Sequence, residues 1–167
     1  MNPIVCDTGP ILHLQEAGLL ELLKKAGDIY IPKVVDIELN ELYPQWENKR
    51  PDWLLVESLS PEETSQAELL SASGLLDSGE AAAIILSKRI NAAWFLTDDT
   101  EARIFATLSG IEVHGSLGIV LWSAAVGHLS YDEAKSALDK LSKTSLWISK
   151  AILSQAYKAL DTIFGKR

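Results

Sequence analysis

Two short apolar runs in this sequence stop at carboxylates, and these acids are the first candidates for chemistry. Residues 3–6 lead into Asp7, and residues 93–97 lead into Asp98 and Asp99. In an open parallel sheet, ligands bind outside the carboxyl ends of the strands, where loops enter helices. If the two runs are neighbouring strands, their acids share one crevice, and such like charges repel unless a cation lies between them. This spacing therefore favours a cation site.

A further acid, Glu38, has an unusual position on a helix expected over residues 33–43. At about 100° per residue, the apolar side chains from Val34 to Leu42 form one stripe, and Glu38 falls inside it, while Asp36 falls on the opposite face. A carboxylate on the core side must be paired, protonated or bound to a metal. The alternative is a glutamate at the rim of the stripe that pairs with a nearby lysine.

Glu80 lies near the start of a helix expected over residues 78–88. Asp77 and Glu80 match a capping box, in which each side chain binds the other residue's backbone N–H. The helix is apolar on nearly every side, so Glu80 is expected to lie deep beside the sheet, where a helix N-terminus stabilises an anion. We interpret Glu80 as a site carboxylate and Asp77 mainly as the cap.

Capping is also an alternative explanation for the acids at the strand ends. Asp7 could cap the first helix, and either Asp98 or Asp99 could cap the helix that leads to Arg103. We expect one of this adjacent pair to cap while the other faces the crevice. Arg103 could form an ion pair with Asp99 or contact a phosphate, and the ion pair is the favoured role.

The order of the remaining elements predicts how these acids are positioned. Further strands are expected over residues 28–31, 53–57 and 111–113, and helical patterns alternate with them. This alternation is typical of an α/β fold with three α/β/α layers around a central parallel sheet, here of about five strands. The other expected helices cover residues 11–25, 100–108, 115–125, 131–141 and 149–164, and one more begins at about residue 60. A polar loop is expected over residues 44–51.

Composition limits the other classes of function. The net charge of -8 disfavours non-specific nucleic-acid binding through a basic surface, although residues 130–167 hold 7 basic and 4 acidic residues. The single cysteine, Cys6, excludes an internal disulfide and a CxxC zinc site. His13, His114 and His128 lie in unrelated elements without ligand spacing, so we expect surface or core roles for them.

No signal-peptide pattern opens the chain, and residues 113–131 lack Asp, Glu, Lys and Arg. This uncharged stretch carries three Gly, two His and three Ser, so it is interpreted as a buried or interface helix and not as a membrane span. We expect a cytoplasmic protein without a membrane partner.

Five stretches together resemble the PIN-domain family of metal-dependent nucleases, and more narrowly the VapC-type toxins of prokaryotes. In chain order they are VCDTGPI (5–11), IPKVVDIEL (31–39), LDSGEAAAI (76–84), LTDDTEAR (96–103) and GSLGIVL (115–121). The resemblance covers about residues 3–125. It implies a PIN-like domain over 1–167 with a core over about 3–125 and a C-terminal helical extension over about 130–165.

The resemblance also implies roles for the acids. Asp7, Glu38, Glu80 and Asp98 carry over as the catalytic and metal-binding quartet, with Asp99 as an adjacent metal ligand and the choice between Asp98 and Asp99 open. Thr8, Asp77 and Arg103 are expected to contact substrate or orient the ligands. Four carboxylates form an all-oxygen site that suits Mg²⁺ or Mn²⁺ and not zinc.

The activity that the resemblance implies is hydrolysis of RNA phosphodiester bonds by a metal-dependent endoribonuclease. The same resemblance implies the toxin role, an antitoxin protein as partner and a homodimer. A haloacid-dehalogenase-like phosphatase would need a second Asp where this chain has Gly9, and a receiver domain would need two acids where Val5-Cys6-Asp7 supplies one. The alternative from another class is a catalytically inactive PIN-like module that binds RNA or a protein partner.

Overall fold

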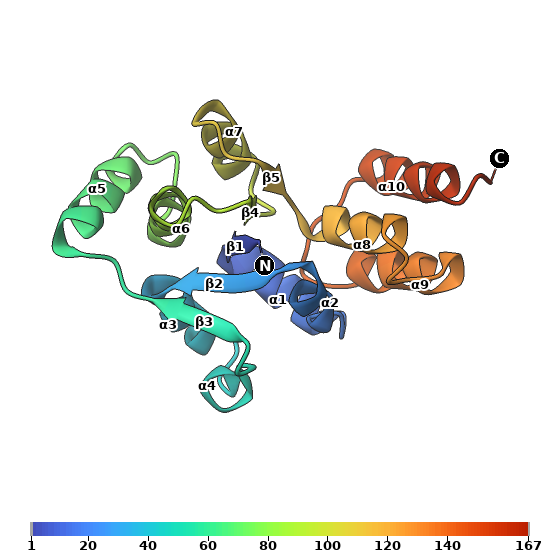
Figure 1. Cartoon of the computed structure of the whole chain (residues 1–167), viewed down its shortest axis with the longest axis horizontal. Helices are drawn as coiled ribbons and strands as arrows, with labels where there is room; N and C mark the ends of the chain where they lie inside the picture. The colour runs from blue at the N-terminus through green and yellow to red at the C-terminus, as the bar shows by residue number, and fades with distance from the viewer. Residues whose placement is uncertain (1, 167) are drawn as a thin grey trace.

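Five parallel strands form the sheet of this protein, in the spatial order β3-β2-β1-β4-β5 (Figure 1). The structure is a computed structural model that describes residues 2–166. The strands are β1 (Pro3–Cys6), β2 (Asp28–Pro32), β3 (Leu54–Glu57), β4 (Trp94–Leu96) and β5 (Val113–His114). Each strand pairs in parallel with its neighbours. The predicted parallel sheet of about five strands is therefore confirmed.

Helices connect and cover the strands. They are α1 (Thr8–Glu16), α2 (Glu21–Ala26), α3 (Lys33–Leu42), α4 (Trp46–Lys49), α5 (Pro61–Ala72), α6 (Ser78–Arg89), α7 (Thr100–Leu108), α8 (Ser116–Ala125), α9 (Tyr131–Ser142) and α10 (Lys150–Ile163). Across residues 2–166, every helix falls short of the length and apolarity that a bilayer span requires.

The two faces of the sheet belong to two separate cores. Successive strand residues point to opposite faces, so Ile4 and Cys6 lie in the core closed by α1, α2, α3 and α8, while Val5 lies in the core closed by α5, α6 and α7. Figure 1 shows α5, α6 and α7 on one side of the strands and α1 to α4 on the other. Helices α9 and α10 pack on α8. The predicted three-layer arrangement is confirmed.

Two local predictions were wrong. The helix expected over 11–25 is divided into α1 and α2, because Gly18 has a positive φ of 70° that breaks the helical path. The loop expected over 44–51 contains α4, whose Trp46 is fully buried. Its indole N–H donates to Asp36 at 2.8 Å, and Arg50 binds the same carboxylate at 2.8 Å. Asp36 is therefore buried and paired.

The central strand β1 marks the point where the connections of the sheet reverse direction. The chain leaves β1 for β2 on one side, and β4 pairs with β1 on the other side. Cys6 lies opposite Leu96, and the next residue, Asp7, donates its backbone N–H to the Leu96 carbonyl at 2.9 Å. Ligands of open α/β sheets bind at such a switch point. The carboxyl ends of β1 and β4 thus place the acids that follow them side by side.

Candidate functional site

A pocket of about 380 Å³ opens at the carboxyl edge of β1 and β4, and we call it the acid pocket. Its lining contains four of the five predicted metal ligands: Asp7, Glu80, Asp98 and Asp99. Thr8, Gly9, His13 and Asp77 line it as well. Acids that are up to 92 positions apart in the sequence therefore face one space. The fifth predicted ligand, Glu38, lies next to the lining residue Thr8.

Asp7 is both a helix cap and a pocket acid. Its Oδ1 accepts a 2.8 Å hydrogen bond from the Thr8 backbone N–H at the start of α1, and its Oδ2 accepts one of 3.1 Å from the Thr97 hydroxyl. The side chain is only 6% exposed. Burial raises the pKa of Asp7 to about 8, and the charges of Glu80 and Asp77 also raise it, against the opposing hydrogen bonds. Asp7 is an acid that is hard to ionise without added positive charge.

Glu38 reaches the site from α3 and packs against the first turn of α6. The Thr8 hydroxyl donates to Glu38 Oε2 at 2.5 Å. A Cβ atom added at Gly79 would lie 2.7 Å from that oxygen, so only glycine leaves room for this approach. Partial burial raises the pKa of Glu38, and the charges of Asp77 and Glu41 act in the same direction. Glu38 therefore points toward the helix N-terminus, and not toward a rim lysine.

Asp77 and Glu80 form the predicted capping box at the start of α6. The Glu80 N–H donates to Asp77 Oδ1 at 2.8 Å, and the Asp77 N–H donates to Glu80 Oε2 at 2.9 Å. Glu80 is 8% exposed, and burial raises its pKa to about 7, with further increases from Asp77, Asp99 and Glu38. The box fixes the glutamate at the pocket wall while its carboxylate stays close to three other acids.

Asp99 is the cap expected from the adjacent pair, but both Asp98 and Asp99 line the acid pocket. Asp99 Oδ1 accepts from the Ala102 N–H at 2.8 Å and caps α7. Asp98 accepts from the Ser116 N–H at 2.7 Å and from the Ser116 hydroxyl at 2.6 Å. Burial alone would raise the pKa of Asp98, but its hydrogen bonds with His13 and Ser116 outweigh burial and hold this pKa below its usual value.

His13 is a titratable pocket residue that sequence reasoning missed. We expected a surface or core role, but its Nδ1 lies 2.7 Å from Asp98 Oδ2 inside the acid pocket. Gly9, one helical turn earlier, borders the ring: a Cβ there would lie 3.5 Å from His13 Cε1 and 3.7 Å from Asp98 Cβ, which are ordinary van der Waals contacts. The place of His13 on α1, the helix that follows the strand-end acid Asp7, was the available signal.

Arg103 does not form the ion pair that we expected. Asp99 is occupied by capping α7, and within residues 2–166 no ion pair joins it to Arg103. Arg103 turns instead toward Gly115, where an added Cβ would lie 2.7 Å from the guanidinium Nη1 and 2.8 Å from Asp98 Oδ1. The guanidinium therefore lies beside the Asp98 carboxylate, outside the lining of the acid pocket.

The donor set of this site suits a hard divalent cation. Asp7, Glu38, Glu80, Asp98 and Asp99 supply carboxylate oxygens, which Mg²⁺ and Mn²⁺ prefer. Within residues 2–166, no three His, Cys, Asp or Glu side chains already converge closely enough to hold a metal ion. The carboxylates are instead held by hydrogen bonds from the protein. Their chemistry fits a metal, and binding one requires some of them to turn from their present partners.

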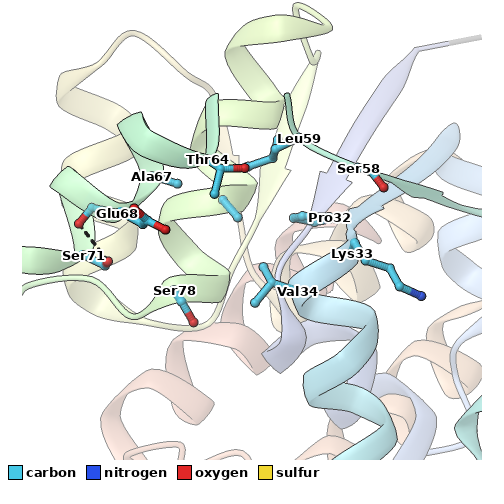
Figure 2. A pocket seen from close by; sticks show the side chains of 11 residues that line it. Pro32, Lys33, Val34, Ser58, Leu59, Thr64, Ala67, Glu68, Ser71 and Ser78 are labelled. Atoms are coloured by element: carbon cyan, nitrogen blue, oxygen red, sulfur yellow. Dashed lines mark hydrogen bonds between the residues drawn. The ribbon is translucent and has the colours of Figure 1, made fainter. Parts of the chain in front are cut away.

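A second hollow, of about 400 Å³, lies between α3, α5 and α6 (Figure 2). Its wall is formed by side chains such as Val34, Leu59 and Ala67. Figure 2 shows the Lys33 side chain extending away from it, and Lys33 Nζ pairs with Asp36 at 3.2 Å. Lys33 therefore does not supply a positive charge to the interior of this hollow.

Comparison with protein families gives a match over residues 3–162 to a family model described as a PIN domain. The matched range contains each acid of the pocket, and it extends through α9 into α10. Neither the curated proteins nor the solved structures contain a match to this chain.

Proposed function

The chain belongs to the PIN-domain family, whose members are generally nucleases that use divalent metals, and we propose that it is a metal-dependent endoribonuclease that hydrolyses RNA phosphodiester bonds. One observation carries this proposal: Asp7, Glu80 and Asp98 come from three different elements and line one pocket at the switch point of the sheet. Burial of several acids in one place is unfavourable for a purely structural role. It is favourable where a cation is to be bound.

We assign Asp7, Glu38, Glu80 and Asp98 as the catalytic acids that would hold Mg²⁺ or Mn²⁺, with Asp99 beside them. Such an ion, when bound, would activate water and stabilise the charge that develops on a phosphoryl oxygen. The chain's own residues orient the acids. The Thr8 hydroxyl holds Glu38, Asp77 holds Glu80, and Ser116 with His13 holds Asp98 in its ionised form.

The finer biological role is proposed from the same resemblance. We propose that the protein is a cytoplasmic VapC-like toxin with an antitoxin partner, and that it forms a homodimer. The uncharged helix α8 is a poor candidate for the dimer face, because Ile119, Val120 and Ala124 are buried within the protein's own core. Any dimer face is expected on other elements.

The proposal is tested by incubating single-stranded RNA with the protein in Mg²⁺, in Mn²⁺ and in EDTA. We expect cleavage with either metal, none in EDTA, and none from Asp7→Asn. Asp52→Asn is the matched control, because Asp52 is exposed and outside the pocket. RNA binding without cleavage under every metal condition would favour the alternative, an inactive module of the same fold.

A further inference from the structure

The acid pocket continues into a wider groove of about 660 Å³ between α7, α8, α10 and the linker that joins α9 to α10. Four residues line both spaces: Asp98, Thr100, Leu146 and Trp147. Figure 1 shows α8, α9 and α10 grouped at one end of the molecule, away from α3 to α5. A polymer that occupies the acid pocket can therefore extend along this groove without leaving the surface.

Trp147 is presented to solvent at the junction of the two spaces. Its side chain is 85% exposed, whereas Trp46 is 1% exposed. The linker that carries it is fixed to α1, because the Ser145 backbone N–H and hydroxyl both donate to the Glu16 carboxylate, at 2.9 Å and 2.5 Å. With the apolar side chains that line the groove beside it, such as Leu146 and Ile152, this indole forms a contiguous apolar surface of the kind found at binding sites.

The rest of the groove combines apolar walls with a cation. Leu117, Leu121 and Ile152 contribute apolar side chains, and Ile152 is 49% exposed. Arg103 lies at the end nearest the acid pocket, close to Asp98. Apolar surface and an indole suit the face of a nucleobase, and a guanidinium suits a phosphate.

The charge of the chain explains why such a surface would be needed for RNA. With a net charge of -8, the protein has little general attraction for a polyanion. Stacking of bases on aromatic rings does not depend on net charge. The segment 130–167, which supplies Trp147 and α10, is also the part of the sequence with an excess of basic residues. RNA is therefore the occupant that these features favour over a protein segment.

We propose that this groove is a subsite for an unpaired nucleobase of the substrate, with Trp147 stacking on the base and Arg103 binding an adjacent phosphate. The proposal rests on the proposed nuclease function and specifies its substrate. Base faces are covered in a duplex, so the RNA must be single-stranded next to the bond that is cleaved.

The test compares Trp147→Ala, Trp147→Phe and Leu108→Ala. Leu108 is a matched control because it is 84% exposed and lines neither the acid pocket nor the groove. Binding is measured by anisotropy of a labelled single-stranded 12-nucleotide RNA and its duplex, in Mg²⁺, with each change placed in the Asp7→Asn background to prevent cleavage. KM for the single strand is measured without that background.

Trp147→Ala should weaken single-strand binding by roughly 5- to 150-fold, the range for losing one base–aromatic stack, with a similar rise in KM. Trp147→Phe should retain most of the affinity but lose the quenching of tryptophan emission by RNA, and Leu108→Ala should resemble the parent protein. Duplex RNA should bind weakly to all of them. Circular dichroism checks that each variant is folded.

The two proposals fail differently. If the parent protein cleaves RNA and Trp147→Ala leaves KM and affinity unchanged, the subsite is refuted while the nuclease function stands. If no RNA is cleaved but single-strand binding depends on Trp147, the groove stands as a site for an unpaired base and the nuclease function is refuted. If Trp147→Ala leaves RNA affinity unchanged but converts a dimer to a monomer in sedimentation, the groove is a protein interface and the subsite is refuted.

Discussion

Replacing Asp7 with Asn should stabilise the metal-free protein at pH 8, although it should abolish cleavage. Asp7 has a pKa of about 8 in the folded chain against an ordinary value of 3.8. Between these values the folded chain retains a proton that the unfolded chain has lost, so stability falls as pH rises from about 4 to about 8. At roughly 1.4 kcal/mol per pH unit, Asp7 alone would remove up to about 4 kcal/mol between pH 5 and pH 8.

Urea unfolding in EDTA at pH 5 and pH 8, followed by circular dichroism, measures this effect. Wild type should lose stability over that interval, Asp7→Asn should lose much less, and the exposed control Asp52→Asn should resemble wild type. In the Asp7→Asn variant, the free energy of unfolding should still fall with pH, but less steeply, because Glu80 has a pKa of about 7. Adding Mg²⁺ at pH 8 should restore stability to wild type and not to Asp7→Asn. Equal pH slopes in wild type and Asp7→Asn would refute the reasoning.

Three other substitutions test the surroundings of the site. Asp36→Asn should cost about 2–3 kcal/mol in urea unfolding at pH 7, because it weakens buried bonds to Arg50 and Trp46. These bonds and the one from Lys33 outweigh burial and lower the pKa of Asp36 in the folded chain. The stability that Asp36 contributes is therefore present above about pH 4 and is lost as the pH falls through this folded pKa. If wild type and Asp36→Asn lose the same free energy of unfolding below pH 4, this explanation is refuted. Gly79→Ala should reduce cleavage by about 10²-fold by displacing Glu38, and activity equal to wild type would show that Glu38 is not needed where it lies. Ser116→Ala should weaken Mg²⁺ binding in calorimetry about 10-fold or more, because the hydroxyl that orients Asp98 is lost, and unchanged affinity would exclude Asp98 as a ligand held by that hydroxyl.

The layers of the fold and the convergence of the acids could be predicted because they depend on short-range patterns. Alternating elements give a parallel sheet. Asp7, Asp98 and Asp99 follow strand ends and Glu80 opens a helix, while Glu38 interrupts the apolar stripe of α3. Trp147 and His13 could not be predicted in the same way. Trp147 is brought to the pocket by the packing of α9 and α10 and by the bonds of Ser145 to Glu16, which are 129 positions apart. The burial of Asp36 could not be predicted from helix periodicity, because Trp46 and Arg50 of the following segment fold back over it.

Capping and a place in the site were alternatives for the acids at the sequence level, but in the structure the acids that cap helices also line the acid pocket. Asp7, Asp77, Asp99 and Asp98 accept N–H groups from the first turns of α1, α6, α7 and α8, respectively. The N-termini of α1, α6 and α7 therefore adjoin the acid pocket, and that of α8 reaches it through Asp98, so each offsets part of the negative charge there. The helix ends can fix the directions of these carboxylates without neutralising them fully, as the raised pKa values of Asp7 and Glu80 indicate. A divalent cation would favour the ionised forms of Asp7, Glu38 and Glu80, whose pKa values are raised without it, so the caps act as the frame of the proposed metal site.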